Sequence, residues 1–146
     1  MVATAILATA IVSLGQLFAI AVVSNRGARA TTYATLLASQ KMEQLRGAVY
    51  ADLTPSPGGA LGRNTSGYVE YLDAYGRSLG GGESPPAGTV YVRRWSIEPL
   101  PANPDNTLVL QVFVTDVAAG VATARASIGR MPHDARLVCV RMRTGS

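Results

Sequence analysis

Residues 2–23 read VATAILATAIVSLGQLFAIAVV, and the first charged residue of the chain is Arg26. The segment is rich in Ile, Val, Leu and Ala, and no proline occurs before Pro55. A helix of about 20 apolar residues is long enough to cross a bilayer core, and small residues such as Gly15 let such helices pack closely together. Residues 1–25 are therefore predicted to form a transmembrane half of the helix, which could also pack closely against other helices.

The helical pattern continues past Arg26 without a break. Between residues 26 and 50 the apolar residues recur in steps of three and four, which places them on one helix face. These residues, which we expect to contact a sheet, are Ala34, Ala38, Met42, Leu45 and Val49. The prolines and glycines of residues 55–59 end the pattern. An amphipathic half of the helix over 26–50 is thus predicted to lie against the rest of the chain, with a loop over 51–66.

Residues 67–146 have the pattern of a small β domain. Apolar and polar residues alternate, and glycine and proline clusters separate the alternating runs. The expected strands are Gly67–Tyr75, Thr89–Leu100, Thr107–Val117 and Ala135–Arg143. Short strands joined by such turns favour an antiparallel sheet. The predicted fold class is α+β, with one long N-terminal helix packed on a sheet of about four strands.

One face of the first half of the helix is a candidate packing surface. Its residues are spaced by three or four, as on a single helix face, and they are Leu7, Ile11, Leu14, Phe18 and Val22. The same residues could equally face lipid, because a membrane helix is apolar on all sides.

Little in the sequence points to catalysis. The single histidine, His133, stands between Pro132 and Asp134, and no Cys/His cluster has the spacing of metal ligands. Glu70 and Asp73 are offset by three, which places them on opposite faces of a strand. The single cysteine, Cys139, is interpreted as a small strand residue. We therefore expect no enzyme activity, no metal and no cofactor.

The net charge of +4 makes a basic binding surface a candidate site. Arginines are the candidate contacts for a partner protein or for DNA, and they are Arg93, Arg94, Arg136, Arg141 and Arg143. Such residues attract DNA by releasing counterions. Arginines also protect an exposed edge strand from unwanted pairing, and we favour that simpler interpretation, so DNA is the less expected partner.

The order of these parts resembles the type IV prepilins and the type II secretion pseudopilins. The resemblance rests on Val2–Leu7 and on Ala38–Arg46, and more loosely on Tyr71–Gly76, Arg93–Trp95 and Leu108–Val114. The later segments look most like minor pilins of the PilV type or the related GspI pseudopilins. The resemblance implies a structural subunit that helps to initiate or cap a type IV pilus or a type II secretion pseudopilus. Its partners would be other pilins or pseudopilins, reached through the N-terminal helix, whose residues 1–25 would form the filament-core half.

The family also implies an inner-membrane helix with the β domain in the periplasm before assembly. The basic leader of the family, its glycine and the Phe-Thr-Leu-Ile-Glu-like start are absent ahead of Val2. Met1 is accordingly expected to be a late start, or the chain to be truncated at this end, and prepilin peptidase is a partner only if a leader exists upstream. The helix proline that is common in major pilins is missing too, which favours an unbroken helix.

Two other interpretations remain. The chain could be a β domain on a single membrane anchor that binds a ligand or DNA without polymerising. It could also be an exported protein that is cleaved after the small-residue triplet Ala19–Ala21. The sequence does not distinguish a type IV pilus from a secretion pseudopilus.

Overall fold

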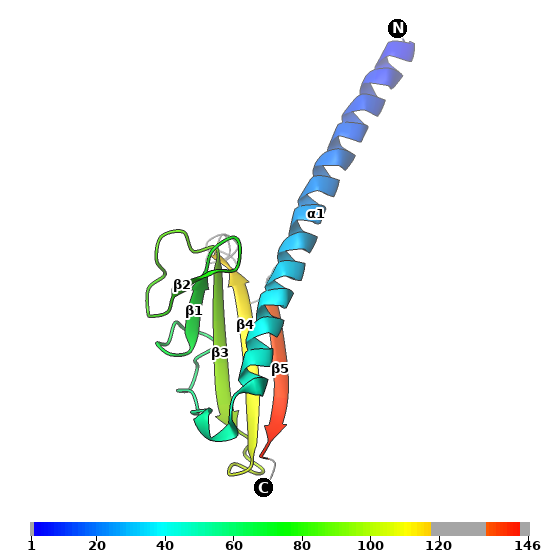
Figure 1. Cartoon of the computed structure of the whole chain (residues 1–146). Coiled ribbons are helices and arrows are strands. Elements are labelled where there is room, and N and C mark those ends of the chain that lie inside the picture. The colour runs from blue at the N-terminus through cyan, green and yellow to red at the C-terminus, as the bar shows by residue number, and fades with distance from the viewer. Residues whose placement is uncertain (1, 118–133, 144–146) are drawn as a thin grey trace.

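The computed structural model describes the backbone of residues 2–117 and 134–143 and, within these ranges, all side chains except those of residues 2–12, 23 and 26. One long helix, α1 (Val2–Gly47), runs without a break for 46 residues, roughly 70 Å at 1.5 Å per residue. Its N-terminal half extends beyond the sheet, and its C-terminal half packs on it (Figure 1). We call the sheet, the packed half of α1 and the segments joining them the head.

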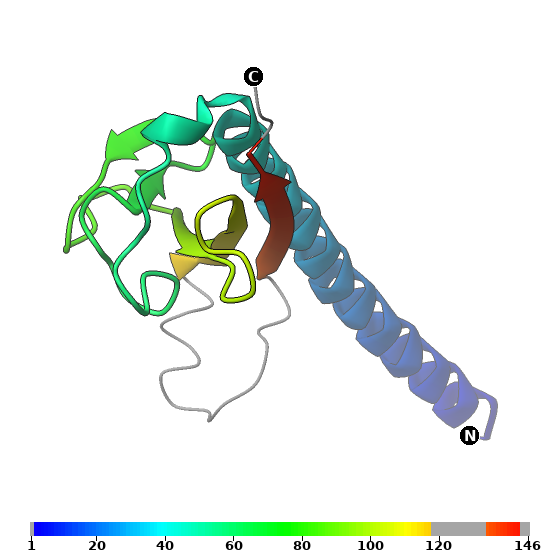
Figure 2. The same cartoon turned by 90° about the horizontal axis from the view of Figure 1, so that it is seen from below.

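The head contains an antiparallel sheet in the order β2-β1-β3-β4-β5 among the described residues. The strands are β1 (Val69–Leu72), β2 (Ser78–Gly80), β3 (Tyr91–Pro99), β4 (Thr107–Asp116) and β5 (Ala135–Met142). The longest strands, β3 and β4, pair over nine residues, from Tyr91 opposite Asp116 to Pro99 opposite Leu108. Helix α1 lies on one face of this sheet, mainly over β4 and β5, as Figure 2 shows from below. The general α+β class predicted from the sequence is confirmed.

The sheet has five strands within the described residues, so the expectation of about four is wrong. The extra strand is β2, and β1 ends at Leu72 rather than at Tyr75. The cause is a turn at Asp73, whose Oδ1 accepts hydrogen bonds from the backbone N–H groups of Tyr75 (2.8 Å) and Arg77 (2.9 Å). This turn sends the chain back along β1. A three-residue exposed strand has no buried face and so leaves no alternation in the sequence.

The helix ends at Gly47, before the expected limit at residue 50. Val49 has an extended backbone (φ −65°, ψ 138°) ahead of the short 3₁₀ helix η1 (Tyr50–Asp52). Its side chain is 63% exposed. The expectation that Val49 contacts the sheet is therefore wrong, because the 3.6-residue period that placed it on the buried face stops two residues earlier.

The core lies between α1 and the face of the sheet that it covers. From α1 it takes Ala34, Leu37, Ala38, Met42 and Leu45, and from the strands mainly Leu72, Ile97, Leu108, Leu110, Val112 and Val114. A smaller cluster of Val69, Tyr71 and Val92 lies on the other face of the sheet. The alternation in β4 matches the sequence, because Leu108, Leu110, Val112 and Val114 are its inward residues.

The expected localisation requires a correction. None of the helices in the described part of the chain is both long enough and apolar enough to cross a membrane. The expectation of a single-pass inner-membrane protein with a periplasmic domain is wrong on this finding, since a span needs about 20 largely apolar residues.

Candidate functional site

The projecting half of α1 carries large apolar side chains that the described part of the chain leaves uncovered. Each is between 50% and 68% exposed, and they are Leu14, Leu17, Phe18, Ile20 and Val22. Three of them belong to the expected packing face, whereas the side chains of Leu7 and Ile11 lie outside the described residues. Leu17 and Ile20 were not expected, and they are exposed because no sheet lies beside this half of the helix (Figure 1).

Most residues expected to contact the sheet are buried in the core. Ala34 and Ala38 are fully buried, and Met42 and Leu45 nearly so. Alanine side chains allow the helix to lie close to β4. The first buried residue of α1 among those described is Ala34, so the projecting half joins the head at this level.

Arg93 joins the helix to the sheet from inside. It is 7% exposed; Nη1 donates to the backbone oxygen of Leu37 in α1 (2.9 Å), and Nη2 donates to Glu70 Oε2 in β1 (2.6 Å). Burial would raise the pKa of Glu70, but the hydrogen bond and charge of Arg93, with smaller help from Ser78 and Lys41, hold that pKa below its usual range. The expectation that Arg93 contacts a partner or DNA is therefore wrong, because its guanidinium is committed to two other elements of the chain.

A second arginine connects β5 to the helix. Arg141 Nη1 donates to the backbone oxygen of Leu45 (2.9 Å). The last carbonyl groups of a helix have no partner within it and carry partial negative charge. Arg93 and Arg141 thus bond to helix carbonyls eight residues apart from strands on either side of β4, which fixes both the rotation and the position of α1 on the sheet.

The remaining candidate arginines do not form one basic patch. Arg94 donates through Nε (2.9 Å) and Nη2 (2.7 Å) to Asn64 Oδ1, and it is only partly exposed. Arg136 is exposed near the start of β5 and donates to Gln111 Oε1. Arg143 is exposed just beyond the other end of that strand. The fold therefore separates the five arginines between the two faces of β3 and the two ends of β5.

A cation–π contact that sequence reasoning missed adds to the junction of helix and sheet. Nζ of Lys41 lies 3.9 Å from the ring centroid of Trp95, which also packs against Tyr68 (6.3 Å between centroids). Burial lowers the pKa of Lys41; the carboxylate of Glu70 opposes this shift and Arg93 adds to it. The contact could have been suspected from the helix pattern, since Lys41 stands between the buried positions 38 and 42.

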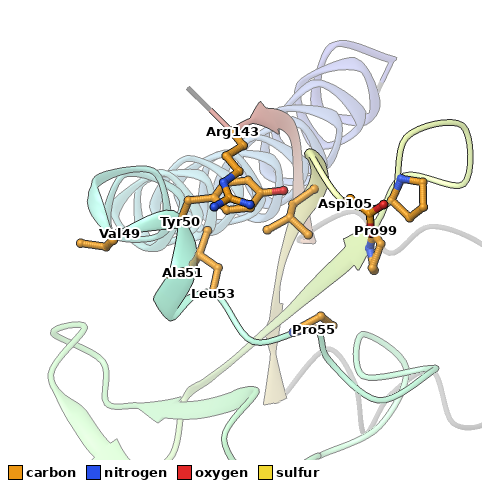
Figure 3. A pocket seen from close by; sticks show the side chains of 10 residues that line it. Val49, Tyr50, Ala51, Leu53, Pro55, Pro99, Asp105 and Arg143 are labelled. Atoms are coloured by element: carbon orange, nitrogen blue, oxygen red, sulfur yellow. The ribbon is translucent and has the colours of Figure 1, made fainter. Parts of the chain in front are cut away.

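A cavity of about 450 Å³ lies at the pole of the head where α1 and β5 end (Figure 3). Its walls are mixed polar and apolar, and its charged groups are Asp105 and Arg143. Among the residues that the structure describes, no group of three or more His, Cys, Asp or Glu side chains could hold a metal ion. Cys139 is half-buried and packs against the core cluster. Neither feature brings together a nucleophile and a base.

Comparison with protein-family models, with curated proteins and with solved structures finds no match to this chain. The geometry of α1 and the head is therefore what indicates the function. The feature that stands out is a long helix of which one half is anchored by core packing and two arginines, while the other half is apolar and uncovered.

Proposed function

We propose that this chain is a structural subunit of a helical filament, of the minor pilin or pseudopilin type. Its projecting helix packs among the helices of companion subunits, and the head is carried on the outside of that bundle. In this role the chain helps to initiate or cap the filament. The observation that carries the proposal is the exposure of the large apolar side chains between Leu14 and Val22.

The exposed side chains supply the driving force. Full burial of a Leu, Val, Ile or Phe side chain is worth about 1.5–3 kcal/mol. Exposed apolar surface that is contiguous on one element marks an interaction site. Burial of the five large apolar side chains from Leu14 to Val22 therefore favours helix packing, and a helix without charge over residues 2–25 imposes little desolvation cost on its partners.

The connection between helix and head supports the same role. A subunit that is held in an assembly by its helix must transmit that position to its head. Arg93 and Arg141 bond two helix carbonyls to two different strands, and the core buries α1 from Ala34 to Leu45. The order of elements, a long N-terminal helix followed by an antiparallel sheet that packs on its second half, is also the order that the resemblance to pilins implies.

An assembly assay with a single charge tests the proposal. Cells of the source organism that carry Phe18→Glu as their only copy should lose most filaments in electron micrographs, because a carboxylate inside a helix bundle is costly. Glu83→Lys on the exposed surface of the head is the control and should assemble normally. Purified Phe18→Glu should unfold at the wild-type temperature, since Phe18 does not contact the head core. Normal filament numbers with Phe18→Glu would refute the proposal.

A further inference from the structure

The side of α1 that faces away from the sheet carries a continuous exposed stripe along both halves of the helix. Its members step by three, four or seven residues and are all exposed, and they are Phe18, Val22, Asn25, Arg29, Thr32, Leu36 and Glu43. We call this set the outer stripe. It includes Leu36, an apolar residue that is 59% exposed although the neighbouring Leu37 is in the core. An exposed apolar side chain therefore also lies on the outside of the head, separated from Val22 by the polar residues Asn25, Arg29 and Thr32.

The spacing of the outer stripe is that of a helix-packing seam. Residues that repeat every seven positions remain on one face when two helices wind around each other. Val22, Arg29, Leu36 and Glu43 form one such series, in which apolar and charged residues alternate. Charged residues within a seam select the register and orientation of the partner. Arg29 and Glu43, of opposite sign and fourteen positions apart, therefore specify an offset.

We propose that a second copy of this chain packs in parallel along the outer stripe, displaced by two heptads. The inference rests on the proposed filament function and adds its partner and register. With this displacement, roughly 21 Å along the helix, Arg29 of one copy faces Glu43 of the other and Val22 faces Leu36. The reciprocal bond does not form in this pair, because Glu43 of the first copy lies beyond the end of the second helix, so the contact is heterologous.

Other alignments of two copies either oppose like charges or leave apolar residues of the outer stripe without a helix opposite them. Parallel copies without displacement bring Arg29 against Arg29 and Glu43 against Glu43, which is repulsive. An antiparallel pair centred on Leu36 also joins Arg29 to Glu43, but it carries each projecting half past the end of the partner helix. Phe18 would then lie without a helix opposite it. The displaced parallel arrangement alone places a helix opposite Phe18 and Val22 and also pairs the charges.

The charge pair is accessible for this purpose. Glu43 pairs with Arg46 on its own helix at 2.7 Å, and both side chains are more than half exposed. Exposed pairs of this kind contribute little to folding and exchange partners readily. Arg29 is exposed at the level where the projecting half joins the head. An intermolecular bond from Arg29 to Glu43 therefore costs the fold little.

Cysteine crosslinking of the full-length chain tests the register. In a Cys139→Ser background, the Val22→Cys protein, the Leu36→Cys protein and an equimolar mixture of the two are each oxidised. The displaced parallel arrangement predicts a crosslinked dimer in the mixture and little in either protein alone. Dimers of Leu36→Cys without dimers of Val22→Cys would show the antiparallel pair, and dimers of both proteins on their own would show undisplaced helices; either result overturns the inference.

Exchanging the charges of Arg29 and Glu43 gives a second test, measured by the yield of crosslinked dimer. Arg29→Glu or Glu43→Arg should each lower the yield in the mixture about fivefold, and the double variant should restore it; Arg46→Ala is the control for the bond that Glu43 makes within its helix. If Val22→Cys crosslinks in cells only to a different protein, the helix-packing function stands and pairing with a second copy is refuted. If neither cysteine crosslinks to any protein, the inference and the proposed function both fail.

Discussion

Nη1 of Arg141 in β5 donates a hydrogen bond to the backbone oxygen of Leu45 in the last turn of α1, at 2.9 Å. The two residues lie 96 positions apart in the chain. This bond places a cation at the negative end of the helix and gives a terminal carbonyl a partner. It connects the edge of the sheet to the helix that we propose as the assembly element.

Removal of this bond should destabilise the head. Arg141→Leu is expected to lower the free energy of unfolding by about 1–2 kcal/mol, because a helix carbonyl loses its partner and the helix end loses a favourable charge. Denaturant unfolding of the purified chain measures the change. Arg143→Leu, two residues away and exposed, should change the free energy by less than about 0.5 kcal/mol. Equal effects of the two variants would show that Arg141 acts only through its charge.

Arg93 should matter more, because it is buried. Arg93→Met is expected to cost about 3 kcal/mol, since Glu70 loses its partner in a partly buried position. The double variant Arg93→Met with Glu70→Met should cost less than the sum of the single variants, because no charge is then left without its partner. Urea denaturation of the four proteins gives the coupling energy. A sum that is strictly additive would contradict a direct interaction.

The same pair predicts a pH dependence in acid. The pKa of Glu70 is lower in the folded chain than its unfolded value of about 4.3. Its contribution to stability is therefore complete well above that value and is lost as the pH falls through the lower folded pKa. The stability difference between the wild type and Glu70→Gln should shrink as the pH falls from about 7 toward about 3. Asp73, whose pKa is also lowered, is present in both proteins and cancels. A constant difference would be inconsistent with the assigned pair.

Gly76 in the turn between β1 and β2 is required for two reasons. Its φ of +75° is one that other residues rarely adopt, and an added Cβ would lie 2.8 Å from Cδ2 of Leu37 in α1. Gly76→Ala should therefore lower the free energy of unfolding by about 1–3 kcal/mol. Gly58→Ala, with open space around it and no positive φ, is the matched control and should be nearly neutral. Comparable melting temperatures for both variants would contradict this close approach.

The elements of the fold that could be predicted are those whose apolar residues recur at a regular spacing along the sequence. The helix follows from its apolar spacing, and β4 follows from the alternation of Leu108, Leu110, Val112 and Val114. Strand β2 was missed because a short exposed strand has no alternation of buried residues. The helix end was placed too late because Val49 continues the apolar period after the backbone has left the helix.

The candidate site was harder to predict, because burial of a charge depends on distant partners. Arg93 was assigned to the surface, although strand alternation groups it with Trp95 and Ile97, which point toward the helix. That grouping was the available signal. Its acceptors, Glu70 and the carbonyl of Leu37, come from other elements and cannot be identified from spacing alone.

Photocrosslinking from position 18 of the full-length chain decides whether the projecting helix is a packing surface. A photoreactive residue that replaces Phe18 in cells should crosslink to the helix of another subunit, identified by mass spectrometry of the joined peptides. The same residue in place of exposed Glu83 on the head should not give that product. Capture of an apolar helix from position 18 is the result that we predict. Recovery of the protein as an uncrosslinked monomer from both positions would contradict the proposal that α1 holds this subunit in a filament.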